Sequence, residues 1–327
     1  MNKNENKTKE DIKKSKDTNI NKSNAKENSQ NNEEQELLDI KNDYVFKRTF
    51  GYKGDEEVTK VLLRDILGMK VNEIDLDVNP ITEKELMDDK LGIMDIASVV
   101  NDNVQVDIEM QVVNKNNIEK RIMYYWNTYY KKSISKGDDY GELKRTIIIL
   151  IADFEIKGIE QAKKYFTEWE IREKDYSELI LTDVLKICII ELPKYIKYRV
   201  NNPNLNLWTE FLENPEVVNM SEKDIENEKD ESIKTTKKAI KQAKDTLEQI
   251  SKDKHEQELA RLRKKYIMDQ NAIQEYGYCQ GVEDGKYESM KDTAKKMLAK
   301  KMPIDVIIEI TGLSKEEIEN IKKGIKN

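Results

Sequence analysis

The sequence predicts an α/β domain followed by a long charged helix and a small C-terminal helical hairpin. Two kinds of segment occur between about residues 43 and 212: stretches with helical spacing of apolar residues, and shorter stretches that are β-branched or alternate between apolar and polar residues. In chain order these segments give helix, strand, strand, strand, helix, strand. After about residue 220 the chain is densely charged, with apolar residues at wide spacing, which is typical of a helix with one narrow apolar face.

The first helical stretch covers residues 43–67 and is interrupted near 51–54, so it predicts one or two short helices. Gly68 then supplies a C-terminal stop. An extended segment at 71–81 and a charged loop at 83–90 follow. This part of the chain therefore leads from helix to strand before the most informative segment begins.

A β-hairpin over residues 92–111 is the clearest strand signal. In its second half apolar residues alternate with polar ones, the pattern of a strand with one apolar and one polar face. If 101–103 is the turn, cross-strand partners have numbers that sum to 204, and the apolar face closes on itself. Asp95 then lies directly opposite Glu109, with Gln111 on the same face.

This register brings two carboxylates together. Directly opposed residues of an antiparallel pair have Cβ atoms about 5 Å apart, so Asp95 and Glu109 could share one divalent cation. Adjacent carboxylates repel each other unless a proton or a cation lies between them. A site of carboxylate oxygens suits Mg²⁺ and indicates metal-assisted phosphoryl transfer. The alternative is a half-exposed hairpin whose polar face meets water.

The rest of the domain is predicted from shorter signals. In order they are an aromatic-rich helix at 117–136, a buried strand at 146–152, helical or mixed segments at 160–173 and 176–181, an apolar β segment at 184–192, and a helix at 205–212.

A long charged helix is expected from residue 221 to about residue 276. Its apolar positions have near-heptad spacing and are Ile233, Ile240, Leu247 and Ile250. Because the repeat is short, two arrangements remain open: a helix folded back on the domain, and a coiled-coil homodimer.

The C-terminal segment has the signals of two short, well-capped helices. Ser314 and Glu317 form a capping box, and Leu313 with Ile318 forms the matching hydrophobic staple. Two helices joined by a glycine turn are compatible with a DNA-reading helix-turn-helix or with a plain helical hairpin.

Composition excludes several classes of function. The single histidine, His255, lies in a charged run, which excludes catalysis through a histidine in a folded cleft. Cys188 and Cys279 lack metal-ligand spacing. Residues 1–36 hold almost no apolar side chains and are expected to be a disordered tail. Neither a signal peptide nor an apolar run of about 18 residues is found, so we expect a cytoplasmic protein without membrane contact. The net charge of −7 argues against a globally basic nucleic-acid binder.

Several motifs in a fixed order resemble those of a known family. They are residues 42–47 with 50–51, 92–95, 107–111, Arg121 with Tyr124 and Tyr125, Gly137 with Tyr140, 191–194 and, at the C-terminus, 311–318. Together they resemble the Rpn family of recombination-promoting nucleases, also described as transposases, which have a PD-(D/E)XK nuclease core. The resemblance to that core spans about residues 43–194.

The resemblance implies a restriction-endonuclease-like αβββαβ core with a mixed central sheet. It implies that Asp95 is the aspartate of the PD motif and Glu109 the first acid of the (D/E)XK motif, both of them metal ligands. Gln111 stands where the superfamily generally has lysine, and an amide can orient a water molecule but cannot titrate usefully. An acid on the first helix supports the site in related cores, which gives Asp43 that role here. Asp107 is expected to be solvent-exposed or to support the site.

The leading functional hypothesis is a divalent-metal-dependent DNA endonuclease that uses Mg²⁺ or Mn²⁺ and is linked to recombination or transposition. Lys47 and Arg121 are the expected phosphate contacts, and Tyr124 is a candidate for stacking on unpaired bases. The alternative, from another class, is a non-catalytic DNA-binding or assembly factor built on a degenerate nuclease core. The expected partners are DNA and a second copy of the chain, bound through the long helix.

Four regions follow from these observations. We expect a disordered tail at 1–36, a nuclease core at 37–215, a long charged helical arm at 216–280 and a C-terminal helical hairpin at 281–327.

Overall fold

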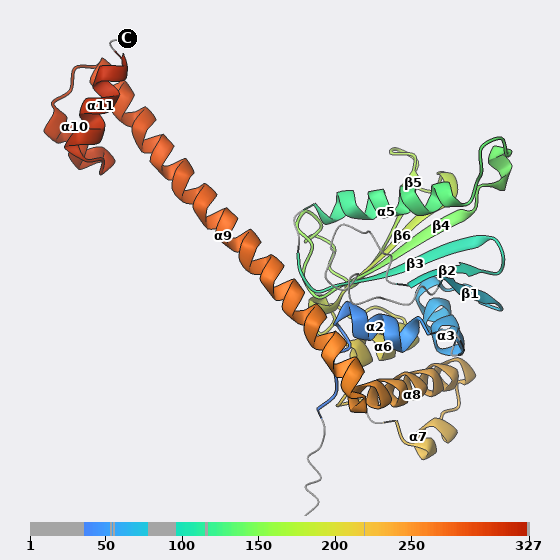
Figure 1. The fold of residues 1–327 in the computed structure, drawn as a ribbon. Coiled ribbons are helices and arrows are strands. Elements are labelled where there is room, and N and C mark those ends of the chain that lie inside the picture. The colour runs from blue at the N-terminus through green and yellow to red at the C-terminus, as the bar shows by residue number, and fades with distance from the viewer. Residues whose placement is uncertain are drawn as a thin grey trace, which may run out of the picture.

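A six-stranded mixed sheet lies at the centre of the computed structural model, which describes residues 36–52, 54, 56–77, 96–114, 117–218 and 220–325 (Figure 1). The strand order is β1-β2-β3-β4-β6-β5, with β3, β4 and β6 parallel and the other neighbours antiparallel. The bounds are β1 Ile74–Asp77, β2 Ile96–Val100, β3 Val104–Gln111, β4 Arg145–Ala152, β5 Phe166–Arg172 and β6 Ile180–Glu191. The expected disordered tail, residues 1–36, lies outside the described residues except for Glu36.

Helices cover both faces of this sheet. On one face lie α2 (Asp43–Phe50), α3 (Glu56–Leu67) and α6 (Pro203–Glu213), with α8 (Glu231–Lys252) packed on the outer side of these helices (Figure 1). The opposite face is covered by α5 (Ile118–Lys132) (Figure 1). The central strand β4 is a β-branched run whose side chains alternate between the two layers. Ile147 and Ile149 pack in the core with the first layer, and Ile148 packs in the core under α5. Such burial on both faces explains why this strand is apolar throughout.

The predicted hairpin register is confirmed for the described residues. Ile96 pairs with Ile108 and Val100 with Val104, so partner numbers sum to 204 as expected. Asn101 and Asp102 adopt left-handed backbone conformations with φ of 49° and 65°, which short polar side chains tolerate best. The hairpin turn is therefore built from the residues that such a geometry favours.

The polar face of this hairpin is not half-exposed, so the alternative reading of a face that meets water is wrong. The side chains of Asp107 and Glu109 are 0% and 3% exposed. The cause is α5, which lies across the face: the Tyr129 hydroxyl donates to the Ser98 carbonyl at 2.9 Å, and the Tyr129 ring packs on Ala97.

Two segments predicted as helical or mixed, 160–173 and 176–181, contain strand residues: β5 lies within the first, and β6 begins at Ile180 in the second. Residues 166–172 form β5, an edge strand, where a helical or mixed segment was expected, because Trp169 and Ile171 alternate with Glu168 and Glu170 rather than following a helical period. The segments predicted as strand at 184–192 and as helix at 205–212 correspond to β6 and α6.

The long charged helix predicted from residue 221 to about residue 276 is broken into three. These helices are α7 (Glu222–Glu226), α8, and the 46-residue helix α9 (Lys254–Ala299). The break between the last two is at Asp253, whose extended backbone and carboxylate cap α9 by accepting from the amides of His255 and Glu256 at 2.7 and 3.1 Å. Helix α9 continues without interruption across the boundary expected between residues 280 and 281.

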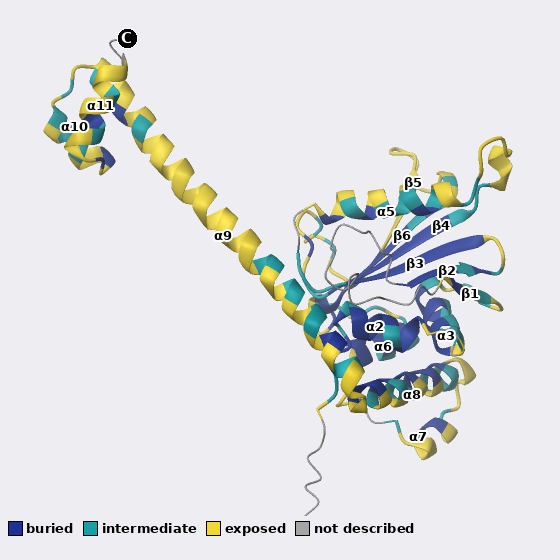
Figure 2. Ribbon diagram, viewed as in Figure 1, coloured by how far each residue is buried: buried dark blue, intermediate teal, exposed yellow. Residues whose placement is uncertain are grey.

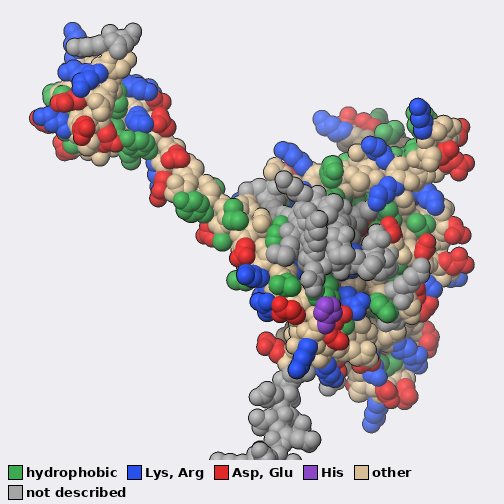
Figure 3. Space-filling view, viewed as in Figure 1, with side chains coloured by type: hydrophobic (Ala, Val, Ile, Leu, Met, Phe, Trp, Pro, Cys, Tyr) green, Lys and Arg blue, Asp and Glu red, His purple; other side chains and the backbone are tan. Residues whose placement is uncertain are grey.

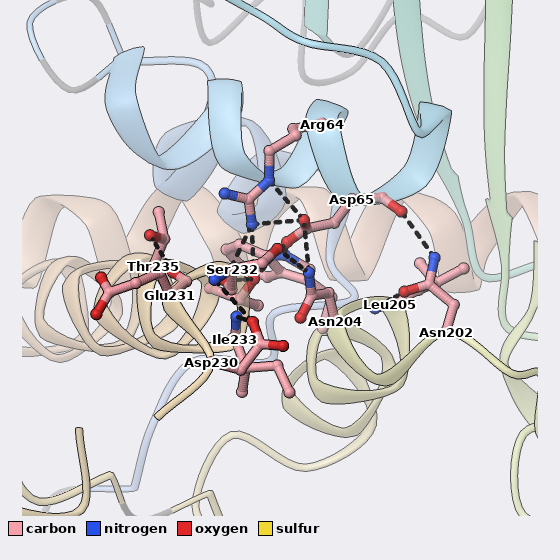
Figure 4. Close-up of polar contacts among 12 residues, drawn as sticks. Arg64, Asp65, Asn202, Asn204, Leu205, Asp230, Glu231, Ser232, Ile233 and Thr235 are labelled. Carbon is pink, nitrogen blue, oxygen red and sulfur yellow. Dashed lines mark hydrogen bonds and ion pairs between the residues drawn. The ribbon is translucent and has the colours of Figure 1, made fainter. Parts of the chain in front are cut away.

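Helix α8 is folded back on the domain. Its apolar residues Ile240 and Leu247 are fully buried in the same core as the sheet. Polar contacts add to this packing, since Arg64 and Asp65 of α3 lie against Asn204 of α6 and Ser232 of α8 (Figure 4). Of the two arrangements left open for the first half of the charged segment, the folded-back helix is the one observed.

Helix α9 leaves the core and carries a small three-helix unit at its far end (Figure 1). Most of its length between the two bodies is exposed (Figure 2). The unit consists of the end of α9 with α10 (Ile304–Thr311) and α11 (Lys315–Ile325), packed around Ala294, Ile307 and Ile318. The predicted capping box is confirmed: the Ser314 amide donates to Glu317 Oε2 at 2.7 Å, and the Glu317 amide donates to Ser314 Oγ at 3.3 Å.

The described residues also form two short 3-10 turns, Tyr140–Glu142 and Leu192–Lys194. In the described part of the chain, no helix combines the length and apolar character needed to cross a membrane.

Candidate active site under helix α5

The acidic face of β3 carries the strongest candidate for chemistry. Period-two alternation places Asp107, Glu109 and Gln111 on the face that α5 covers, while Val106 and Ile108 point into the core on the other side. The two carboxylates are thus neighbours on one strand and both are buried. Burying two acids side by side is costly unless something compensates their charge.

Glu109 shows this cost directly. Burial, and then the nearby Asp107 carboxylate, raise the pKa of Glu109 well above its ordinary value, while the Arg121 guanidinium opposes the rise. Glu109 Oε2 accepts a hydrogen bond from the Gln111 side-chain nitrogen at 3.3 Å. Among the described residues, Glu109 Oε1 has no hydrogen-bond partner. Within the described residues, one oxygen of this carboxylate is therefore buried without a hydrogen-bond partner.

Arg121 of α5 links this strand to the covering helix. Its Nη1 donates to Gln111 Oε1 at 3.3 Å, and its Nη2 donates to the Tyr125 hydroxyl at 2.9 Å. A narrow cavity between β3, β4 and α5 is lined by Glu109, Gln111, Arg121, Tyr125, Ile118 and Leu150. The side chains form a chain of contacts that runs from Tyr125 through Arg121 and Gln111 to Glu109.

The first predicted metal ligand, Asp95, lies outside the described residues. It precedes Ile96, the first residue of β2, directly in the sequence. The end of α2 approaches this point closely: a Cβ added to Gly51 would lie 3.4 Å from Ile96 Cγ1 and 2.8 Å from the Lys47 carbonyl oxygen. Lys47 itself is buried, with 8% of its surface exposed.

The other predicted residues have separate surroundings. The Asp43 carboxylate is paired with Arg263 of α9, whose Nε lies 3.0 Å from Oδ1 and whose Nη2 lies 2.5 Å from Oδ2. Tyr124 is 64% exposed on the outer surface of α5. His255 is exposed in the first turn of α9, as the sequence predicts (Figure 3).

Sequence reasoning missed two features of this site. The first is the complete burial of Asp107, for which the sequence predicts either solvent exposure or support of the site. The second is a buried ion pair at the end of β6, where Lys194 Nζ lies 2.7 Å from Glu191 Oε2. The sheet register places Gln111, Ala152 and Glu191 in one row across three parallel strands. The period-two pattern could have found the first, but the second needs the strand order.

The described donors fit part of a site for a hard cation. Glu109 Oε1 is a buried carboxylate oxygen without a hydrogen-bond partner in the described part of the chain, and Asp107 adds a second carboxylate on the same face. Such oxygens are the ligands that Mg²⁺ and Mn²⁺ prefer. Within the described residues no group of three His, Cys, Asp or Glu side chains could hold a metal ion. A full site therefore needs a donor in addition to these.

Two family models match the chain. One is described as PD-(D/E)XK nuclease family transposase and matches residues 40–277, which include the sheet, the helices on both of its faces and the first part of α9. The other is described as the C-terminal HTH domain of the Rpn/YhgA-like nuclease family and matches residues 292–323, the three-helix unit. Searches of curated proteins and of solved structures each found no match.

Proposed function

Because the chain belongs to the PD-(D/E)XK nuclease family transposases, we propose that it is a divalent-metal-dependent DNA endonuclease that acts in recombination or transposition. The observation that carries the proposal is the buried Glu109 carboxylate, with one oxygen lacking a partner in the described part of the chain and with Asp107 beside it. A bound cation would offset the burial cost of both acids.

In this proposal Asp95 and Glu109 would hold Mg²⁺ or Mn²⁺ through carboxylate oxygens, and Asp107 adds negative charge on the strand face that carries Glu109. When bound, the cation supplies a water of lowered pKa and stabilises charge on the scissile phosphate. Gln111 orients the attacking water, since its amide offers both a donor and an acceptor. The α5 layer limits access of bulk solvent to the acids, which strengthens electrostatic interactions there.

DNA contacts come from two parts of the molecule. The C-terminal unit, which matches an HTH domain, supplies binding remote from the acids. In the core, Lys47 is the proposed phosphate contact, through the 8% of its surface that is exposed. The ring of Tyr124, which is 64% exposed, is the proposed stacking partner for an unpaired base. In this proposal the C-terminal unit binds DNA and the core cleaves it.

Cleavage of supercoiled plasmid tests the proposal. The purified protein is incubated with Mg²⁺, Mn²⁺, Ca²⁺ or EDTA and compared with Asp95→Asn and Glu109→Gln. We expect nicking or linearisation that requires metal and falls by at least about 100-fold in both variants. Glu119→Gln, which changes an exposed carboxylate on α5, is the matched control and should cut like the wild type. DNA binding without cutting by the wild type would support a non-catalytic binding or assembly factor instead.

The role of Asp43 has its own test, because its carboxylate is already paired with Arg263. If Asp43 acts by anchoring α9, Asp43→Asn and Arg263→Met should lower cleavage to a similar extent and leave Mn²⁺ affinity unchanged. If it supports the metal directly, Asp43→Asn alone should weaken Mn²⁺ binding in a calorimetric titration.

The proposal also includes a homodimer formed through α9. Apolar side chains on the exposed part of this helix include Ile273 and Tyr276, which are 65% and 69% exposed. Sedimentation velocity of full-length Ile273→Glu should then show a shift toward the monomer. Ile196→Glu is the matched control, since this isoleucine is 87% exposed on the core domain. Equal sedimentation of all three proteins as monomers would refute the dimer.

A further inference from the structure

Position 111 poses a chemical problem for the proposed nuclease. The PD-(D/E)XK superfamily generally has a lysine there, whereas this chain, like the Rpn-type sequences it resembles, has a neutral glutamine. A lysine would offset phosphate charge and orient the attacking water, but a neutral amide supplies no charge. A positively charged side chain close to the acids can supply this charge in place of the lysine, in addition to the charge of the proposed cation.

We propose that Arg121 of α5 is a positioning residue for the cleavage reaction, which orients Gln111 and supplies the positive charge that this glutamine lacks. The inference rests on the proposed nuclease function. It replaces the expectation, drawn from the sequence, that Arg121 is a phosphate contact.

The hydrogen bonds of Arg121 fix the orientation of the Gln111 side-chain amide. A guanidinium can only donate, so its contact with Gln111 requires the amide oxygen of Gln111 to face Arg121. The amide nitrogen then faces Glu109 and donates to Oε2. If the amide were flipped, Arg121 would face an NH₂ group and Glu109 would face a carbonyl oxygen. Arg121 therefore selects the one orientation of Gln111 that satisfies both neighbours.

Helix α5, which carries Arg121, is anchored to the sheet. The Trp126 indole nitrogen donates to the Thr146 carbonyl at 3.1 Å, and the Tyr129 hydroxyl donates to the Ser98 carbonyl at 2.9 Å, so the helix is bonded to strands on both sides of β3. The Tyr125 hydroxyl accepts from the second guanidinium nitrogen. The Arg121 head group is thus held over the acidic face by a fixed helix and not by a mobile loop.

Arg121 also offsets the negative charge of the buried acids. Asp107 and Glu109 are buried next to each other, and the Arg121 guanidinium is a counter-charge that acts on Glu109 from the covering layer. With two of its nitrogens committed to Gln111 and Tyr125, the side chain is poorly arranged to clamp a phosphate at the surface. The charge and the hydrogen bonds of Arg121 therefore both act on groups inside the site.

Kinetics of four proteins test this assignment: wild type, Arg121→Met, the double variant Gln111→Lys with Arg121→Met, and Lys120→Met. The last removes an exposed charge at the adjacent position of α5 and is the matched control. We expect Arg121→Met to lower kcat by about 10- to 100-fold with KM for DNA nearly unchanged, as is typical when a supporting partner is lost. Lysine at position 111 should restore most of that loss, and Lys120→Met should behave like the wild type.

A second measurement does not depend on activity. In the metal-free protein with labelled glutamine side chains, the Gln111 NH₂ protons should be protected from exchange in the wild type and lose that protection in Arg121→Met. A variant that merely loosens the fold would instead reduce protection of many glutamines together, which would count against a specific role.

Three results would overturn the inference. A raised KM with weaker salt dependence and unchanged kcat would make Arg121 a phosphate contact. Full activity of Arg121→Met, while Glu109→Gln is inactive, would remove the inference and leave the nuclease proposal standing. Absence of metal-dependent cutting by the wild type would remove both.

Discussion

Asp65 is a buried carboxylate whose removal should measurably destabilise the core. It is 5% exposed at the end of α3 and accepts hydrogen bonds from the Trp208 indole at 2.9 Å and the Thr236 hydroxyl at 2.7 Å. Arg64 and Asn204 donate to its other oxygen (Figure 4). One side chain thereby joins α3, α6 and α8.

The size of the effect follows from what Asp65→Ala leaves behind. Trp208 is fully buried, so its N–H group loses its acceptor at a cost of about 1–3 kcal/mol. Thr236 loses less, since its single hydroxyl proton can turn to the Ser232 carbonyl, which lies 3.1 Å away. The Arg64 side chain is 28% exposed and can turn to water, so its loss is small. We expect a total of about 3 kcal/mol, and about half of that for Asp65→Asn, which keeps one acceptor.

Urea unfolding followed by circular dichroism and tryptophan fluorescence gives this free energy. Asp183→Asn, a change at an exposed aspartate of β6, is the matched control and should stay within about 0.5 kcal/mol of the wild type. A loss of less than about 1 kcal/mol for Asp65→Ala would refute the reasoning, because it would mean that Trp208 finds another acceptor or that the three helices do not depend on this contact.

Two further predictions concern ionisable groups. Burial raises the pKa of the Cys188 thiol to about 12, whereas Cys279 is exposed, so iodoacetamide at neutral pH should label one thiol in the native protein and two after unfolding; labelling of both in the native state would contradict this. Hydrogen bonds, the first from the Ser314 hydroxyl, hold the pKa of Glu317 at about 2. Since this is below the unfolded value of 4.5, the capping box should stabilise the C-terminal unit above about pH 4.5 and weaken as the pH falls toward 2. A carboxyl-carbon NMR titration should give a low midpoint for Glu317 that moves toward 4.5 in Ser314→Ala; a midpoint near 4.5 in the wild type would count against it.

The hairpin shows what local sequence can predict. Its register follows from the pairing of one apolar face with another, a constraint contained entirely within residues 96–111. The C-terminal capping box is equally local, because Ser314 and Glu317 lie within one turn of helix. Both predictions were confirmed for that reason.

Some errors arise where a distant part of the chain decides the structure, whereas others have a local signal. Burial of Asp107 depends on α5 lying across β3, which the alternation of the strand alone does not reveal. The break at Asp253 does have a local signal, since Asp253 is followed by Glu256 at capping-box spacing, but a continuous charged pattern masked it. The Arg121 contacts with Gln111 also needed the docking of α5. Asp95 lies outside the described residues, so its place in the site stays a prediction.

The length of α9 fixes the distance between the core and the C-terminal unit. Its base is fixed to α2 through Arg263 with Asp43 and through Glu256 with Arg48, and its next buried residue after Ala260 is Ala294. At about 1.5 Å per residue, the intervening helix spans roughly 50 Å, or about one and a half turns of B-DNA.

Any DNA held by the C-terminal unit would therefore meet the acids of the core at a defined distance from the bound segment. Adding seven residues to α9 would lengthen this distance by about 10 Å and rotate the C-terminal unit by only about 20°. Insertions of seven residues would therefore change the distance between the C-terminal unit and the core while nearly preserving their relative orientation.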